Sequence, residues 1–220
     1  MLVIQSNGTK ERFSPNKILD KINSLSKGLS KIDTDQLSKE IINNVIDGIS
    51  TKEISELSAG LAANKASVSY DYSILASRLI MDSLYKVTPN TFIDSIEDLY
   101  SSNYLSQEYY NKILSYDLNM LEQSLDYDKD FEYDFFAVGT LQSSYLMKNS
   151  KGKVAERPQH MHMRMATFLT ETLKEAITLY KMLSNKLISP ASPIIFNSGT
   201  KKSTLVSCNL ISMLKGEDML

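Results

Sequence analysis

The sequence predicts a mainly α-helical protein that opens with a β-hairpin and ends with one buried β-strand. Apolar residues recur at helical spacing through most of residues 14–187. Near the end, the β-branched, apolar run TLVSCNLISM (204–213) follows two prolines and the segment FNSGT, which is typical of a strand buried on both faces. Helices are therefore expected first and the start of a sheet last.

The composition argues against several classes of protein. The 220 residues carry a net charge of −2 and one cysteine, so a general nucleic-acid surface and an internal disulfide are not expected. No apolar run approaches the ~20 residues that cross a bilayer, and the N-terminus does not resemble a signal peptide. We expect a cytoplasmic protein with no membrane contact and no nucleic-acid partner.

The first 90 residues predict a hairpin followed by four helices. Residues 2–5 and 10–13 are the candidate strands, joined by an Asn-Gly pair that favours a tight hairpin turn. Ser14 and Pro15 suit the N-cap and first position of a helix.

Further signals mark the next three helices. Gly48 is expected to end the second helix, and Ser50 with Glu53 forms a capping box at the start of the third. A fourth helix is predicted over residues 72–86, closed by Pro89.

The remaining chain predicts more helices. Apolar stripes cover 92–99 and 109–118, a helix follows through 141–145, and one long helix is predicted over 161–187.

The acidic and aromatic run DYDKDFEYD (126–134) is interpreted as a solvated loop, because it lacks the glycine and terminal glutamate of a calcium loop. The two histidines, His160 and His162, lie two apart and do not share a helix face, so no metal site is expected.

Two features suggest a binding site, but each also has a simpler structural interpretation. Lys10, Arg12 and Lys17 lie near a predicted helix N-terminus, as in a phosphate site, although solvated charges are the simpler interpretation. Cys208 is the lone cysteine on an apolar strand, which usually means packing. The hydroxyl-bearing residues around its glycine turn are also typical of a phosphate site.

Several motifs together resemble a known family. ERPQHMHMRMA (156–166), ASPIIFNSGT (191–200) and LVSCNL (205–210) occur in the order found in the large subunit of class I ribonucleotide reductase. The N-terminal VIQSNGTKERFSPNKI resembles the ATP-cone that opens many of these subunits. DYSILASRL (71–79) and SYLMK (144–148) also fit, so the resemblance covers essentially the whole chain.

The resemblance implies three regions. Residues 1–90 correspond to an ATP-cone, a β-hairpin capped by four helices. Residues 91–187 correspond to the helical reductase N-terminal domain, and residues 188–220 to the start of a ten-stranded α/β barrel with its first strand.

It also implies a function and site residues. The family reduces ribonucleoside diphosphates to deoxyribonucleotides by thiyl-radical chemistry, with a radical metal cofactor in the small subunit and electrons from thioredoxin or glutaredoxin. Cys208 matches the first cysteine of the redox pair, and Ser192 and Ser207 match residues that hold the substrate. A second cysteine, the radical cysteine and the rest of the barrel are expected from the remainder of the large subunit or a second polypeptide. Such enzymes form homo-oligomers, and we expect the 220 residues alone to be inactive.

The resemblance further implies an allosteric site for ATP or dATP. The corresponding positions are Gln5, Ser6, Lys10, Glu11, Arg12, Phe13, Ser14, Pro15, Asn16, Lys17, Thr51 and Ser55. Gln5 and Ser6 stand where the family often has Lys-Arg, and Ser55 replaces a common aspartate.

Two other readings remain open. The chain could be a nucleotide-binding regulatory or assembly module with no catalytic contribution, or a degenerate cone that only packs against a partner. A related DNA-binding repressor has paired zinc-ribbon cysteines, which this chain lacks.

Overall fold

The computed structural model describes residues 1–5, 8–202 and 204–208. Its elements are β1 (Leu2–Ile4), β2 (Lys10–Arg12), α1 (Pro15–Leu25), α2 (Thr34–Asn44), α3 (Thr51–Asn64), α4 (Asp71–Tyr85), α5 (Phe92–Ser101), α6 (Gln107–Leu114), α7 (Leu118–Gln123), the 3₁₀ helix η1 (Tyr127–Glu132), α8 (Phe135–Thr140), the π-helix η2 (Leu141–Tyr145), α9 (Pro158–Leu169), α10 (Leu173–Ser184) and α11 (Ser192–Asn197). None of the helices in the described part of the chain is long and apolar enough to cross a membrane.

The predicted hairpin is present and is fastened to the start of α3. Strands β1 and β2 pair antiparallel, with Leu2 opposite Arg12. The amide of Ile4 donates to the carbonyl of Ile49 (3.0 Å), and the amide of Gly48 donates to the carbonyl of Leu2 (2.9 Å). These bonds hold the N-terminus of α3 beside the hairpin.

Helix α2 ends earlier than predicted. It stops at Asn44, and Val45 is extended with ψ 129°. Gly48 therefore does not cap the helix; it adopts φ +81° in the turn that brings the chain to β1. Gly48 has the left-handed backbone that a helix-ending glycine would have, but it belongs to the turn toward β1 and not to the end of α2.

Helices α3 and α4 pack closely through small side chains. The buried face of α3 consists of Ser55, Ser58, Ala59 and Ala62. The stripe that predicted this helix, Ile54, Leu57 and Leu61, is only partly buried. The predicted capping box of Ser50 and Glu53 is present.

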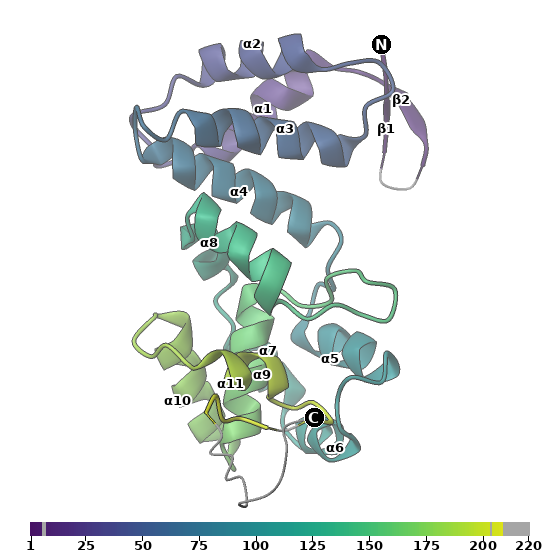
Figure 1. The fold of residues 1–220 in the computed structure, drawn as a ribbon, viewed down its shortest axis with the longest axis vertical. Coiled ribbons are helices and arrows are strands. Elements are labelled where there is room, and N and C mark those ends of the chain that lie inside the picture. Colours follow the sequence, from purple (N-terminus) through teal and green to yellow (C-terminus); the bar gives the residue numbers. More distant parts are fainter. Residues whose placement is uncertain (6–7, 203, 209–220) are drawn as a thin grey trace, which may run out of the picture.

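Helix α4 belongs to two hydrophobic cores. Its first turns, with Leu75 and Leu79, pack in the core of the N-terminal unit, which we define as residues 1–90. Its last turns, with Met81 and Leu84, pack in the core of the following helices. Figure 1 shows α4 lying beneath α1–α3, with α8 below it and the other helices beyond.

The long helix predicted over 161–187 is two helices. Thr170 is extended, and Thr172 begins α10 with a second capping box, in which its side chain and that of Glu175 bond each other's amides. Asp117 likewise caps α7 and separates it from α6. Local capping therefore overrides a continuous apolar pattern.

The acidic run is not a solvated loop. It forms η1, and Asp130 at its centre is fully buried. Asp130 accepts hydrogen bonds from the Tyr85 hydroxyl (2.7 Å) and the Gln159 amide (2.9 Å). The acidic side chain thus joins η1 to α4 and α9.

The C-terminal segment differs from the prediction in two ways. ASPIIFNSGT contains the short helix α11 rather than only a loop. Residues 204–208 form neither a helix nor a strand, and Cys208 is exposed rather than buried. Among the described residues, no neighbouring strand pairs with this segment; the side-chain amide of Asn197 donates to the carbonyl of Thr204 (2.6 Å), and Leu205 is partly buried. The rest of the predicted strand lies outside the described residues.

Candidate functional site

A cavity of about 360 Å³ opens between the hairpin, α1, α3 and α4. Apolar side chains, among them Val3, Ile18 and Leu79, form part of its lining. Its charged lining residues are Glu11, Lys17, Lys21, Asp82 and Lys86. Three lysines against two carboxylates leave the lining with a net positive charge at neutral pH.

Two helices begin at this cavity. Ser14 is the N-cap of α1, and its side chain makes no capping bond. Thr51 is the first residue of α3. Both Ser14 and Thr51 line the cavity, so it adjoins two helix N-termini, where the helix dipole favours anions. The start of α3 is already capped by Ser50 and Glu53, whereas that of α1 has no side-chain cap.

One ion pair joins β2 to α1 at the cavity. The ammonium of Lys17 contacts both oxygens of Glu11, at 3.1 and 3.0 Å. The hydrogen bond from Lys17 lowers the pKa of Glu11. Lys17 remains largely exposed, so its ammonium is accessible to a ligand.

A second cluster joins α1, α3 and α4. Lys21 Nζ and Lys86 Nζ each lie 2.8 Å from Asp82 Oδ2, and Lys21 also donates to Ser55 Oγ (3.1 Å). Burial lowers the pKa of Lys21, against the opposing effect of Asp82. Burial acts to raise the pKa of Asp82, but hydrogen bonds from both lysines outweigh it, and the pKa is lowered.

Half of the residues predicted to bind ATP or dATP line this cavity. They are Glu11, Phe13, Ser14, Lys17, Thr51 and Ser55. Gln5, Lys10, Arg12, Pro15 and Asn16 are not among its lining residues. Ser6 lies outside the described residues.

Sequence reasoning missed Lys21, Asp82 and Lys86. A signal was available, because Lys21 follows Lys17 by four residues and Lys86 follows Asp82 by four, which places each pair on one helix face. Their meeting across α1 and α4 depends on the tertiary structure.

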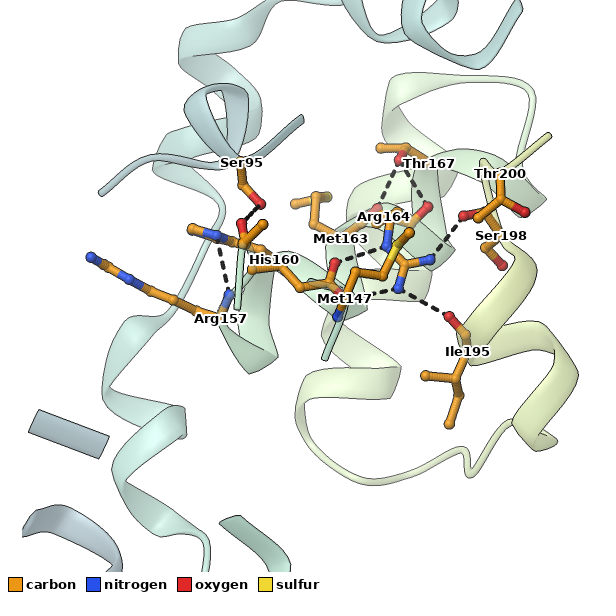
Figure 2. A network of polar contacts seen from close by, with 12 residues as sticks. Ser95, Met147, Arg157, His160, Met163, Arg164, Thr167, Ile195, Ser198 and Thr200 are labelled. Carbon is orange, nitrogen blue, oxygen red and sulfur yellow. Dashed lines mark hydrogen bonds and ion pairs between the residues drawn. The ribbon is translucent and has the colours of Figure 1, made fainter. Parts of the chain in front are cut away.

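The segment that leads to Cys208 is held by a buried ion pair between Arg164 of α9 and Glu156, which precedes that helix. Arg164 contacts Glu156 through Nε (2.8 Å) and Nη2 (2.9 Å), and both side chains are almost completely buried. Figure 2 shows Arg164 reaching on to α11, where it donates to the carbonyls of Ile195 (3.0 Å) and Ser198 (2.8 Å). The Glu and Arg of the ERPQHMHMR motif therefore fix the FNSGT turn.

That turn also depends on glycine. Gly199 has φ +77°, and a Cβ there would lie 2.6 Å from ring atoms of Tyr109. Its carbonyl accepts a hydrogen bond from the amide of Ser106 (3.0 Å).

The residues predicted for substrate and redox chemistry are only partly brought together. Ser207 Oγ lies 3.9 Å from Cys208 Sγ, and both residues are exposed. Ser192 instead contacts the Tyr145 hydroxyl (3.3 Å), beside a second cavity of about 310 Å³.

The two histidines take part in tyrosine contacts. His160 Nε2 lies 2.9 Å from the Tyr127 hydroxyl, and His162 Nε2 lies 3.0 Å from the Tyr133 hydroxyl. Both rings are buried. Within the described ranges, no three His, Cys, Asp or Glu side chains gather in a way that could hold a metal ion.

Comparison with known proteins gives two family matches along the chain. Residues 1–87 match the ATP cone domain, and residues 131–203 match the ribonucleotide reductase all-alpha domain.

Curated relatives carry the name ribonucleoside-diphosphate reductase large subunit. The protein from Dictyostelium discoideum is 36% identical over 228 residues, which cover 97% of this chain and 26% of the relative. Those from Danio rerio and vaccinia virus are 37% and 35% identical, again over 97% of this chain and over 28% and 29% of their own length. The chain thus spans less than a third of the length of these relatives.

Proposed function

This chain carries an ATP cone domain and the all-alpha domain of ribonucleotide reductase, the arrangement at the N-terminal end of ribonucleoside-diphosphate reductase large subunits, and from this premise we propose that its cone binds ATP or dATP as the allosteric effector of that enzyme. The effector occupies the cavity between the hairpin and α4. The triphosphate meets lysine side chains and helix N-termini, and the base and ribose lie against the remaining wall.

The observation that carries this proposal is the net positive cavity at two helix starts. The positions where the family often has Lys-Arg hold Gln5 and Ser6 here, which removes two cations. Lys21 of α1 and Lys86, directly after α4, add two cations. These two lysines keep the net charge of the lining positive, and the exposed Lys17 supplies the charge-assisted contact to phosphate, which is among the stronger kinds of hydrogen bond.

Titration calorimetry with ATP and dATP tests the proposal. Wild-type protein is expected to bind both nucleotides, and Lys17→Ala is expected to weaken ATP binding about tenfold or more, through loss of one charged contact. Lys27→Ala is the matched control, because Lys27 is an exposed lysine just after α1 and does not line the cavity. A folded wild-type protein that gives no heat at millimolar ATP would favour the degenerate cone.

The catalytic part of the proposal concerns Cys208. In the complete enzyme, Cys208 and a second cysteine give two electrons and two protons to the ribonucleoside diphosphate, whose 2′-hydroxyl is replaced by hydrogen and leaves as water, and the two thiols become a disulfide. These 220 residues contain one cysteine, so the second redox thiol, the radical thiol and the radical-bearing small subunit come from other sequence. Thioredoxin or glutaredoxin then reduces the disulfide, and Ser192 and Ser207 hold the substrate.

Cys208→Ser in the complete enzyme distinguishes this role from simple packing. Multiple turnover with external reductant should be lost, while folding and ATP binding are retained. Unchanged turnover would support the second candidate, a regulatory or assembly module whose Cys208 does no chemistry. That candidate is favoured by one observation: the nucleotide cavity is formed by this chain alone, whereas the chain gives Cys208 no second thiol.

A further inference from the structure

Two carboxylates line the cone cavity, and they differ in how their oxygens are used. Glu11 places both oxygens on the ammonium of Lys17. Asp82 receives Lys21 and Lys86 at the same atom, Oδ2. Its Oδ1 makes no hydrogen bond or ion pair with the described residues. Asp82 therefore offers a charged acceptor that the protein itself does not use.

The neighbouring hydroxyls of Ser55 and Ser58 are poorer hydrogen-bond acceptors than Asp82 Oδ1. Ser55 donates its proton to the carbonyl of Thr51 (3.1 Å), and Ser58 donates to that of Ile54 (2.7 Å). A neutral hydroxyl oxygen is also a weaker acceptor than a carboxylate.

Asp82 is held firmly in place. Lys21 reaches it from α1, Lys86 contacts it from the position directly after α4, and Lys21 is also bonded to Ser55 of α3. The carboxylate is thus fixed where three helices meet, and its side chain is 31% exposed. A fixed, partly desolvated acceptor gives more binding energy than a mobile one on the surface.

We propose that Asp82 binds the ribose hydroxyls of the nucleotide, with Oδ1 as acceptor, and that the triphosphate lies toward Lys17 and the start of α1. The inference rests on the proposed nucleotide site and adds the orientation of the ligand in it. Ribose hydroxyls are proton donors, and O–H···O⁻ bonds are short and strong. A triphosphate is anionic and presents acceptor oxygens, so a free carboxylate oxygen repels it. Asp82 on α4 thereby supplies a carboxylate where α3 offers only Ser55.

The sign of one mutational effect tests this orientation. If Asp82 binds ribose, Asp82→Ala should weaken ATP binding about tenfold to a hundredfold. If the phosphates lay beside Lys21 and Lys86 instead, the same change would remove a repelling charge, free two lysines and tighten binding.

The experiment is calorimetry with ATP and with 2′,3′-dideoxy-ATP, which lacks both ribose hydroxyls. Wild-type protein should bind ATP at least about tenfold more tightly, and Asp82→Ala should bind the two ligands alike. Glu40→Ala is the matched control: Glu40 pairs with Lys65 at 2.9 Å in the same unit, away from the cavity lining. It should behave as wild type. If Asp82→Ala does not fold, the isosteric Asp82→Asn should still reduce the ratio of the affinities for ATP and 2′,3′-dideoxy-ATP.

Two results would overturn the inference alone: equal binding of both ligands by wild type, or tighter ATP binding by Asp82→Ala. In either case the nucleotide site would stand and its orientation would be wrong. Absence of ATP binding by wild type would overturn the nucleotide site itself, and this inference with it.

Discussion

At the scale of single residues, buried charge organises the second half of the chain. Arg164 and Glu156 neutralise each other in the core, and Met147 donates its amide to Glu156 (2.9 Å). Asp130 has no such ion pair and is held by neutral donors from Tyr85 and Gln159. These two carboxylates should therefore respond differently to mutation and to pH.

Glu156→Gln should destabilise the fold by about 3–5 kcal/mol, because it leaves the buried guanidinium of Arg164 without its counter-charge. Urea unfolding measures the change. The control is Glu56→Gln, which disrupts the exposed pair with Lys52 and should cost less than ~0.5 kcal/mol. Equal costs for the two variants would contradict the structural role of the buried pair.

Asp130 and the two histidines should give opposite pH dependences. Burial raises the pKa of Asp130 to about 7, against the hydrogen bonds from Tyr85 and Gln159. Burial lowers the pKa of His160 to about 3 and that of His162 to about 4. Between about pH 5 and 6, the folded state keeps Asp130 protonated and both rings neutral, while the unfolded state has the reverse. Because the folded state keeps both histidine rings neutral, they lower the free energy of unfolding as the pH falls. Because it keeps Asp130 protonated, Asp130 lowers the free energy of unfolding as the pH rises.

Asp130→Asn removes one of these opposing contributions. The free energy of unfolding should then fall more steeply on acidification, by about 1.4 kcal/mol per pH unit relative to wild type. Urea unfolding of both proteins at several pH values between about 5 and 6 measures the two slopes. Parallel slopes would mean that the carboxyl of Asp130 is ionised in the folded protein over this range.

At the scale of elements, the sequence predicted what local signals determine. The Asn-Gly hairpin, Pro15 at the start of α1 and the capping box at Ser50 are all contained in a few neighbouring residues, and β1–β2, α1 and α3 are found where expected. The break after α9 was also local, in the Thr172–Glu175 capping box, but a continuous apolar pattern concealed it.

What the sequence could not predict depends on partners distant along the chain. Asp130 reads as a solvated residue because Tyr85 and Gln159 are far from it in sequence. The Lys21–Asp82 pair joins α1 to α4 across 61 positions, so that part of the candidate site was missed. Residues 204–208 read as a buried strand, yet a strand needs neighbours that the described chain does not supply.

Glycine in the turn after α11 gives a test at this scale. Gly199→Ala should cost about 1–3 kcal/mol more than Gly28→Ala, because the new methyl group overlaps the ring of Tyr109. Gly28 is a matched control: its φ is +80°, close to that of Gly199, and a Cβ there meets nothing within 4 Å. Equal losses in thermal or urea unfolding would show that Tyr109 moves aside and that the turn is not tightly packed.

At the scale of the whole molecule, α4 joins the candidate effector site to the helical body. Its Asp82 lines the cone cavity, and Tyr85, three residues on, bonds Asp130 of η1. Arg157 of the ERPQ motif stacks over the ring of Tyr85, with its guanidinium carbon 3.9 Å from the ring centroid. A ligand that reorganises the Asp82 cluster therefore acts on a helix that is packed in both cores (Figure 1).

The proposed nucleotide site lies between the hairpin, α1, α3 and α4. Hydrogen–deuterium exchange with and without ATP can locate the ligand on the unmodified chain. ATP should slow exchange in α1, in the first turns of α3 and at the end of α4, while α6 and α10, which do not line the cavity, should exchange as before. Protection confined to the second cavity, around Tyr145 and Ser192, or no protection in the cone at saturating ATP, would show that nucleotide does not bind between the hairpin and α4.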